Sequence, residues 1–237
     1  MIFMKAVPAV NLIDPLPLMS AATGWGAIFL VHAAVVQRSS LALFARRLRS
    51  LGFEVHNQSY PNRRLDVAGC AEYLRPGLIH LSETSPGPVH LVGHSLGGLV
   101  IRRLLDLHQP SNLGRVVTLG TPHRGSRLAD LLHRRWFYRK LFGPAGQDLT
   151  SDRPLDWVGP WPPPYPIGLV AGSLPIGPGT GLLPWTSDGT VARESAQPPG
   201  GTDYALVPAT HTTLPFLKIT ARLTASFLRN GRFRLTD

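Results

Sequence analysis

The stretch VHLVGHSLGG, at residues 89–98, decides the fold. A short apolar run precedes the pattern Gly-x-Ser-x-Gly, and an apolar-periodic segment at residues 99–107 follows it. Strand, tight turn and helix in this order are typical of a nucleophile elbow, whose serine sits in a strained backbone conformation. The residues two before and two after the serine must lack a Cβ, since a side chain there would collide with neighbouring backbone. We therefore predict that Ser95 is a nucleophile, with helix N–H groups behind it for a developing oxyanion.

A nucleophilic serine needs a histidine base, and the base needs an acid that orients it. On a sheet of this kind the three follow in the order serine, acid, histidine. His211 is the only histidine in the last hundred residues, and it lies between a short predicted strand at 204–207 and the final predicted helix. Of the other histidines after Ser95, His108 ends the predicted elbow helix and so lies far from the hydroxyl. His123 and His133 come too early to follow an acid at the end of a later strand. We predict that His211 is the base.

The acid is less narrowly determined. The carboxylates between the serine and the histidine are Asp106, Asp130, Asp148, Asp152, Asp156, Asp188, Glu194 and Asp203. Asp188 follows the apolar run at 167–172 and lies in a turn sequence, SDGTV at 187–191. We predict that Asp188 is the acid, and Asp203 is the second candidate.

Four segments in this order resemble bacterial lipases and esterases of the α/β-hydrolase superfamily. They are GHSLGG at 93–98, TLGTPHRGS at 118–126, SDGTV at 187–191 and ATHT at 209–212. The second segment is similar to one that recurs in triacylglycerol-lipase-like proteins and in the related inositol deacylases. The resemblance runs from about residue 27 to the end of the chain. It implies a serine esterase or lipase in which Ser95, Asp188 and His211 form the triad.

The sequence departs from the family pattern at the oxyanion loop. Such enzymes carry His-Gly after the first core strand, whereas here the strand at 27–31 leads into His32, Ala33 and Ala34. By position, the N–H groups of Ala34 and Leu96 would form the oxyanion hole. If the family glycine has a positive φ, Ala33 strains or reshapes the loop, and Ala33→Gly should raise kcat on a short ester.

Hydrophobic periodicity predicts an α/β fold with a mostly parallel central sheet, helices on both faces and a small or absent cap. Further strands are expected at 55–60 and 116–120, and helices at 40–51, 66–80, 126–135 and 214–228. We expect Pro76 to disturb the second of these helices near its end.

We expect an irregular extension at residues 1–22 and a single domain at 23–237. A Pro-, Gly- and Trp-rich excursion at about 136–187 interrupts the pattern. It is either a small cap or apolar wall for an acyl chain, or a surface excursion whose tryptophans pack on the domain. The segment RRWFYRK at 134–140 is typical of interfacial segments, but a solvated basic helix end with its aromatics in the core is favoured.

Composition limits the class of protein. The chain has 237 residues, a hydrophobic share of 43% and a net charge of +10. These values fit one globular domain, which we expect to be a monomer. Its single cysteine, Cys70, excludes an internal disulfide. The basic balance favours peripheral contact with anionic membranes or fatty-acid products, and the sequence carries no nucleic-acid-binding motif.

Residues 16–36 lack charged side chains and resemble a membrane span or a signal segment. We favour a buried strand at 27–31, because buried parallel strands read as continuous apolar runs. With no clear signal cleavage site the sequence slightly favours a cytoplasmic location and leaves secretion or membrane association open.

The sequence as a whole predicts a hydrolase of carboxylic esters that uses no metal or organic cofactor. Two alternatives remain: an acyltransferase with the same triad, and a non-catalytic hydrolase-fold protein that binds a membrane or a partner.

Overall fold

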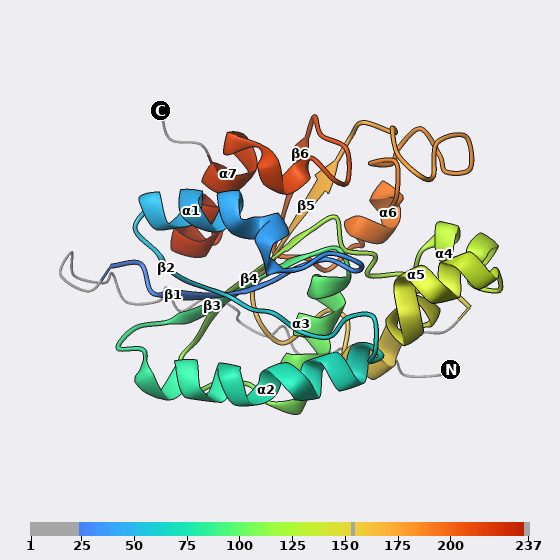
Figure 1. The fold of residues 1–237 in the computed structure, drawn as a ribbon. Helices are drawn as coiled ribbons and strands as arrows, with labels where there is room; N and C mark the ends of the chain where they lie inside the picture. The colour runs from blue at the N-terminus through green and yellow to red at the C-terminus, as the bar shows by residue number, and fades with distance from the viewer. Residues whose placement is uncertain (1–23, 153–154, 235–237) are drawn as a thin grey trace, which may run out of the picture.

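A parallel sheet carries the fold. The computed structural model describes residues 24–152 and 155–234, and the predicted extension at 1–22 lies outside them. The described residues form one six-stranded sheet of order β2-β1-β3-β4-β5-β6, in which all neighbouring strands are parallel (Figure 1). The strands are β1 (Ala27–Val31), β2 (Glu54–Asn57), β3 (Val89–His94), β4 (Leu113–Leu119), β5 (Ile167–Gly172) and β6 (Asp203–Val207).

Helices cover both faces of the sheet, with α1 and α7 on one side and α2 and α3 on the other (Figure 1). The helices are α1 (Ala42–Ser50), α2 (Val67–Thr84), α3 (Leu96–Leu107), α4 (Arg127–Leu132), α5 (Trp136–Gln147), α6 (Arg193–Ala196) and α7 (Lys218–Asn230). Short 3₁₀ turns occupy Arg38–Leu41, Leu155–Val158 and Leu214–Phe216. The predicted fold class, a parallel sheet between two layers of helices, is confirmed.

Strand β1 accounts for residues 27–31 of the uncharged run near the N-terminus. Successive residues of a strand point to opposite faces. Phe29 and Val31 accordingly join the apolar core under α2 and α3, whereas Ile28 and Leu30 join the core under α1 and α7. A strand buried on both faces must be apolar throughout, as predicted for 27–31. Within the described ranges, no helix is long and apolar enough to cross a membrane.

The predicted strands at 27–31 and 167–172 coincide with β1 and β5, but helix ends differ from prediction. Helix α2 continues through Pro76 to Thr84. A proline inside a helix removes one hydrogen bond, and here the buried side chains of Leu74 and Leu78 hold both sides of it against the core. The predicted helix at 214–228 is divided into a 3₁₀ turn and α7, which ends at the left-handed Gly231.

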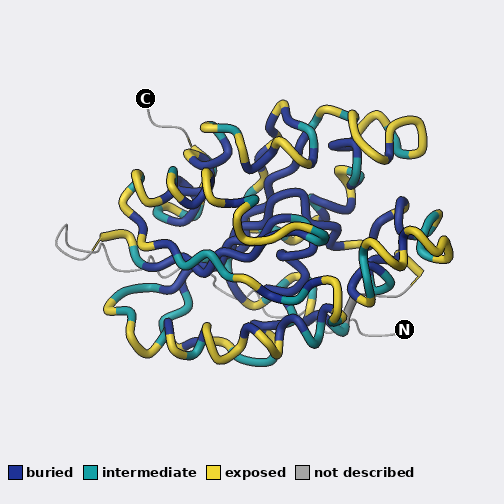
Figure 2. The backbone as a smooth tube through the Cα atoms, in the orientation of Figure 1, coloured by how far each residue is buried: buried dark blue, intermediate teal, exposed yellow. Residues whose placement is uncertain are grey.

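The excursion at 136–187 contains a helix that the sequence did not predict. Helix α5 fills its first part and breaks at Gly143, where φ is 62°. Its Trp157 and Trp161 pack against the core, but Trp185 is 87% exposed. Figure 2 shows the buried sheet with exposed outer surfaces on the helices and on the loop before α6. Two of the three tryptophans of the excursion therefore pack on the domain, and a role of the excursion as a wall for an acyl chain stays a prediction.

Candidate active site

The nucleophile elbow has the predicted geometry. Ser95 stands between β3 and α3 with φ 53° and ψ −122°, a conformation that non-glycine residues rarely adopt. A Cβ on Gly93 would lie 2.6 Å from the amide nitrogen of Gly98, and one on Gly97 would lie 2.4 Å from the carbonyl oxygen of Val31. The Gly-x-Ser-x-Gly pattern is therefore a steric requirement of this turn.

Asp188 and His211 form a buried pair beside the elbow. The Nδ1–H of His211 donates to Oδ2 of Asp188 at 2.7 Å, and its backbone N–H donates to the Asp188 carbonyl oxygen at 2.8 Å. The other carboxylate oxygen accepts from the N–H groups of Thr190 at 3.0 Å and Val191 at 2.7 Å. Because Nδ1 carries the proton, Nε2 of His211 is left as the acceptor that a general base needs.

Ser95 and His211 line the same cavity, at the carboxyl ends of the strands. Asp203, the second candidate for the acid, is the first residue of β6 and therefore lies at the amino ends of the strands, opposite the cavity. Its carboxylate accepts from the N–H groups of Phe233 at 2.7 Å and Tyr204 at 2.9 Å. The structure thus brings together the three side chains predicted by chain order and leaves Asp203 apart from them.

His94, within the elbow motif, has a role that the sequence analysis missed. Its Nε2 lies 3.1 Å from the carbonyl oxygen of His211, so Nε2 must carry the hydrogen and donate it. Burial, and then the neighbouring His211, lower the pKa of His94 to about 3, which keeps the ring neutral. The side chain therefore positions the loop that carries His211, and nothing in a Gly-x-Ser-x-Gly pattern signals this contact.

His123, in the family-like segment, supports the structure. Its Nε2 lies 2.9 Å from Oγ1 of Thr118, and its ring centroid lies 4.8 Å from that of Trp161. Burial holds the pKa of His123 well below its ordinary value. Its backbone N–H donates to the Ser195 carbonyl oxygen at 3.0 Å, which ties this loop to α6.

The predicted oxyanion donors lie next to the nucleophile. Leu96 is the first residue of α3, so its N–H has no acceptor inside the helix. Ala34 lines the cavity that contains Ser95. In the described part of the chain, neither backbone N–H donates to a protein acceptor. Both donors are therefore available to a bound oxyanion.

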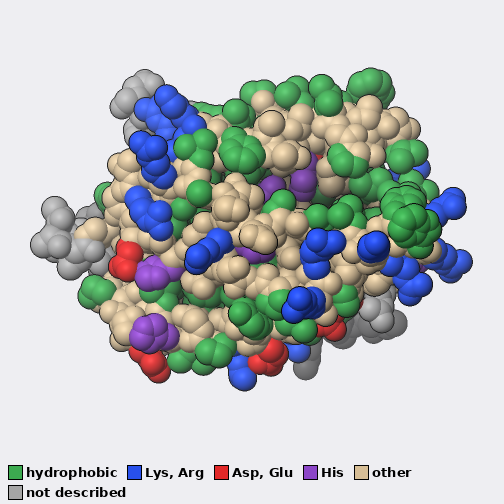
Figure 3. All heavy atoms as spheres, in the orientation of Figure 1, with side chains coloured by type: hydrophobic (Ala, Val, Ile, Leu, Met, Phe, Trp, Pro, Cys, Tyr) green, Lys and Arg blue, Asp and Glu red, His purple; other side chains and the backbone are tan. Residues whose placement is uncertain are grey.

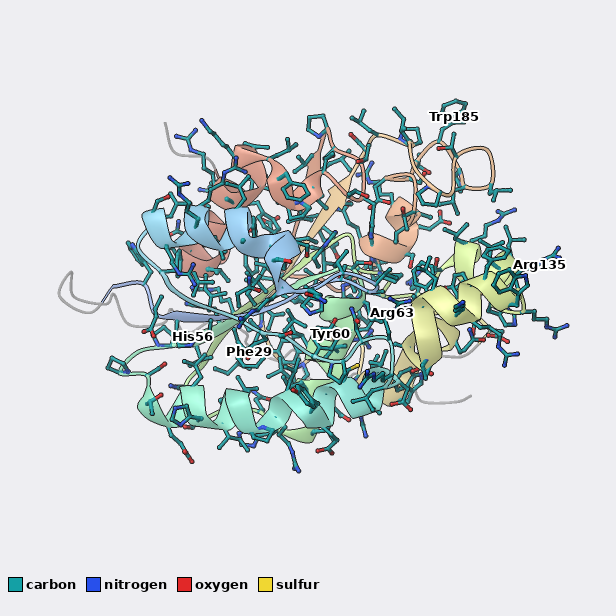
Figure 4. The ribbon with its side chains drawn as sticks, in the orientation of Figure 1. Phe29, His56, Tyr60, Arg63, Arg135 and Trp185 are labelled. Atoms are coloured by element: carbon teal, nitrogen blue, oxygen red, sulfur yellow. The ribbon has the colours of Figure 1, made fainter. Side chains whose placement is uncertain are left out.

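Two side chains from the loop after β2 hold the oxyanion loop. The hydroxyl of Tyr60 donates to the His32 carbonyl oxygen at 2.6 Å, and its ring stacks on the His32 imidazole with centroids 4.3 Å apart (Figure 4 labels Tyr60). The amide of Asn62 donates to the carbonyl oxygens of Ala33 and Val36, each at 2.9 Å. The sequence analysis missed both residues.

The expected strain at Ala33 is wrong. Among the described residues, the non-glycine positions with positive φ are Ser95 and Val35, whose φ is 68°. Ala33 therefore fits its place without a left-handed backbone, and the strained position lies two residues further along.

The cavity beside Ser95 has a volume of about 370 Å³ and a mainly apolar wall. Its lining contains no Asp, Glu, Lys or Arg side chain among the described residues. Apolar walls come from the β1–α1 loop, from α4 and α5, and from the 3₁₀ turn before α7: Val35, Val36, Leu41, Leu128, Tyr138, Leu141, Phe142, Leu149, Pro215 and Phe216. Figure 3 shows a hollow with histidine side chains inside it and hydrophobic side chains gathered around it.

Cys70 takes no part in this site. Its side chain is buried in the core under α2 and α3, and burial raises the pKa of its thiol to about 12. Elsewhere in residues 24–152 and 155–234, no three His, Cys, Asp or Glu side chains lie close enough to share a metal ion.

A family model described as the alpha/beta hydrolase fold matches residues 41–145, which include the elbow. The chain has the α/β-hydrolase fold. The mature Bacillus licheniformis lipase BlEst2 superimposes on this chain with a TM-score of 0.63 and 22% identity, covering 85% of this chain and 90% of that one.

Curated relatives match this chain over shorter segments. A triacylglycerol lipase from Pseudarthrobacter phenanthrenivorans is 44% identical over 52 residues, which is 22% of this chain and 16% of the lipase. The lysosomal thioesterase PPT2 of Mus musculus is 29% identical over 85 residues, 32% of this chain and 28% of the thioesterase. The matched segments thus span less than a third of each relative.

Proposed function

We propose that this α/β-hydrolase cleaves carboxylic esters through an acyl-enzyme on Ser95. One observation carries the proposal: the buried Asp188–His211 pair and the strained Ser95 meet at one cavity. Structural strain and a buried carboxylate both cost free energy, and they concentrate at functional sites. The similarity to a triacylglycerol lipase and to lipase structures agrees with the same chemistry.

In the proposed reaction, Oγ of Ser95 attacks the ester carbonyl carbon while Nε2 of His211 takes the hydroxyl proton. The N–H groups of Leu96 and Ala34 bind the oxyanion of the tetrahedral intermediate. The imidazolium of His211, stabilised by Asp188, then gives its proton to the alcohol that leaves. Water attacks the acyl-enzyme by the same route, which releases the acid and restores the serine.

The cavity wall favours an acyl group as the part of the substrate held next to Ser95. An apolar wall without charged side chains gains roughly 0.8 kcal/mol for each CH₂ group that it removes from water. A cavity of about 370 Å³ and the lack of a large cap favour short or medium acyl chains. Because the wall offers no cation for an acidic group, we propose neutral acyl esters as the substrate class.

The test is hydrolysis of p-nitrophenyl esters, from acetate to palmitate, by the wild type and by Ser95→Ala. We expect Ser95→Ala to lose at least ~10⁴-fold in kcat. Ser40, which lines the same cavity, supplies the control, and Ser40→Ala should keep its activity. A phenylmethylsulfonyl adduct should map to Ser95, and an ester-cleaving protein with Ser95 unmodified would contradict the assignment.

The acid is tested in the same assay with two matched amide variants. Asp188→Asn should lower kcat about 10⁴-fold, because an amide no longer holds the productive tautomer of His211. Asp203→Asn should leave kcat within about threefold of the wild-type value, since this carboxylate lies at the amino ends of the strands. Equal losses in the two variants would contradict the role of Asp188.

Two other activities are distinguished by the same experiments. Product analysis with a competing alcohol separates transfer of the acyl group from hydrolysis. The non-catalytic alternative rests on the altered oxyanion loop at Ala33, a residue without a left-handed backbone. Hydrolysis of any ester by the wild type would exclude this alternative, and folded wild-type protein without activity on any ester would contradict the proposed enzyme.

A further inference from the structure

An exposed aromatic and basic surface lies on one side of the cavity mouth. Helices α4 and α5, which supply one wall of the cavity, turn large apolar side chains to solvent at 131–141. Trp136 is 75% exposed and Phe137 is 47% exposed. The aromatics of 134–140 therefore do not all lie in the core, contrary to the favoured interpretation of the sequence, and only Tyr138 is buried.

A second exposed apolar segment lies across the mouth. The loop between β5 and α6 contributes Pro178 to the cavity and has no charged residue at 173–187. Ile176 is 66% exposed and Trp185 is 87% exposed. Figure 4 labels Trp185 on this loop and Arg135 before α5, both at the right-hand end of the molecule. We call the two segments, 131–141 and 173–187, the rim of the cavity.

The α4–α5 part of the rim carries positive charge that the protein does not neutralise. Residues 124–141 contain six Arg or Lys and a single carboxylate, Asp130. Both oxygens of that carboxylate accept from Ser151, at 2.7 Å and 2.6 Å. Four exposed basic side chains next to the aromatics have no carboxylate partner among the described residues: Arg134, Arg135, Arg139 and Lys140. Figure 3 shows blue and green side chains side by side over this end of the molecule.

We propose that the rim docks this protein on an anionic lipid bilayer. Tryptophan and phenylalanine settle in the boundary between headgroups and acyl chains, and arginine and lysine pair with anionic headgroups. Because the two apolar segments flank one mouth, docking would turn the cavity toward the membrane. Binding needs no chemistry at Ser95, so the proposal stands or falls separately from the proposed function.

A second copy of the chain is a poorer occupant of the rim. A two-fold interface sets the same patch of both copies against itself. The four basic side chains of each copy would then face their counterparts without an acidic partner, and like charges oppose such contact. An anionic lipid surface supplies the opposite charge over the whole patch, so we commit to the bilayer.

The test is co-sedimentation of the full chain with phospholipid vesicles. We expect binding to vesicles of phosphatidylcholine mixed with phosphatidylglycerol, and much weaker binding to phosphatidylcholine alone. Raising the salt concentration should weaken binding, because exposed charges are screened. Ser95→Ala should bind like the wild type, which separates docking from catalysis.

Matched variants locate the surface. The double variant R135Q/R139Q should lower the partition coefficient about 30-fold, at roughly fivefold for each charge. The control R46Q/R222Q removes two exposed charges from α1 and α7 and should change it less than threefold. Trp136→Ala and Trp185→Ala should each lower it at least ~10-fold, whereas Tyr73→Ala, at an exposed site on α2, should not.

Three outcomes would overturn the proposal. The first is no binding to mixed vesicles by folded wild-type protein, and the second is an equal loss in R135Q/R139Q and R46Q/R222Q. The third is a dimer in sedimentation velocity that Trp136→Ala abolishes while vesicle binding stays unchanged, because the rim would then join two copies.

Discussion

At the scale of single residues, Ser95 and Val35 both have a left-handed backbone, and the reasons for the two differ. Ser95 has φ 53° because the elbow must lift its hydroxyl clear of the sheet. Val35 has φ 68°, although a β-branched side chain is among the least suited to this region. It lies one residue after the predicted oxyanion donor Ala34, and it lines the cavity. The strain is therefore stored beside the reacting atoms, where the hydrogen bonds of Asn62 hold the loop.

Glycine substitutions at Val35 and Ala33 should differ in their effect on stability. Ala33→Gly adds freedom to the unfolded chain and relieves nothing, so the free energy of unfolding should fall by about 0.5–1 kcal/mol. Val35→Gly likewise adds freedom to the unfolded chain and also loses some packing. It removes strain of roughly 1–3 kcal/mol, so the free energy of unfolding should stay unchanged or rise. Urea denaturation of both variants measures this, and an equal loss at the two positions would exclude strain at Val35.

At the scale of elements, the loop after β1 is shaped by the loop after β2. Tyr60 and Asn62 donate three hydrogen bonds to carbonyl oxygens between His32 and Val36. These bonds restrain the peptide groups around Ala34, whose N–H is a predicted oxyanion donor. A positioned donor is worth more in the transition state than in the ground state.

Tyr60→Phe and Asn62→Ala should therefore each lower kcat about tenfold while KM changes by less than about twofold. The control is Tyr73→Phe, which removes an exposed hydroxyl on α2 and should leave both constants unchanged. Kinetics on a short p-nitrophenyl ester provide the measurement. If KM rises while kcat holds, the two side chains shape substrate binding, and their role in positioning the oxyanion donor is refuted.

Local pattern predicted the elements whose signal is local. Burial on both faces requires the apolar runs of β1 and β5. The tight turn at Ser95 requires the glycines on either side of it. Both requirements concern residues that are close together in the chain. Chain order led to His211, because strand order on a parallel sheet fixes where each loop emerges. Asp188 needed in addition the apolar run at 167–172 and the turn sequence at 187–191, since chain order left Asp203 open as the second candidate. The paired geometry, Nδ1 to Oδ2 at 2.7 Å, agrees with that selection.

Contacts between distant residues could not be predicted in this way. Tyr60 donates to a carbonyl oxygen 28 positions earlier in the chain, and hydrophobic periodicity carries no information on contacts between residues so far apart in the sequence. Helix α5 was missed because its Gly143 and Pro144 are strong breakers, and the helix does break there. The tryptophans of the excursion were expected either to pack on the domain or to form a wall for an acyl chain, and the 87% exposure of Trp185 matches neither expectation.

At the scale of the whole molecule, four buried histidines make folding depend on pH. His32, His90, His94 and His123 are all buried, and burial lowers the pKa of each. In His90 the pKa falls to about 4, while its ring accepts from the N–H of Arg115 at 2.9 Å and donates to the carbonyl oxygen of Trp25 at 3.1 Å. The bond from Arg115 requires an Nδ1 without a hydrogen, so protonation of the ring would break it, whereas the bond to Trp25 would remain.

The direction of the pH effect follows from proton binding. As the pH falls below about 6.5, the unfolded chain takes up protons at these histidines before the folded chain does, because burial lowers each pKa. The unfolded state then binds more protons, so stability falls as the pH falls. For His90, the stabilisation is complete above about pH 6.5 and is lost progressively toward the folded pKa of about 4. Each buried histidine adds up to ~1.4 kcal/mol per pH unit to the slope.

We therefore expect the free energy of unfolding, measured in urea at several pH values between 7.5 and 5, to decrease steeply below about pH 6.5. His90→Gln keeps a donor and an acceptor but cannot titrate, so its slope should be shallower by up to ~1.4 kcal/mol per pH unit, whatever its stability at pH 7.5. His80→Gln, at an exposed site on α2, should keep the wild-type slope. A wild-type slope in His90→Gln would mean that His90 is protonated in the folded protein. Its contacts argue against this, because the nitrogen that accepts from Arg115 would then have to carry a hydrogen.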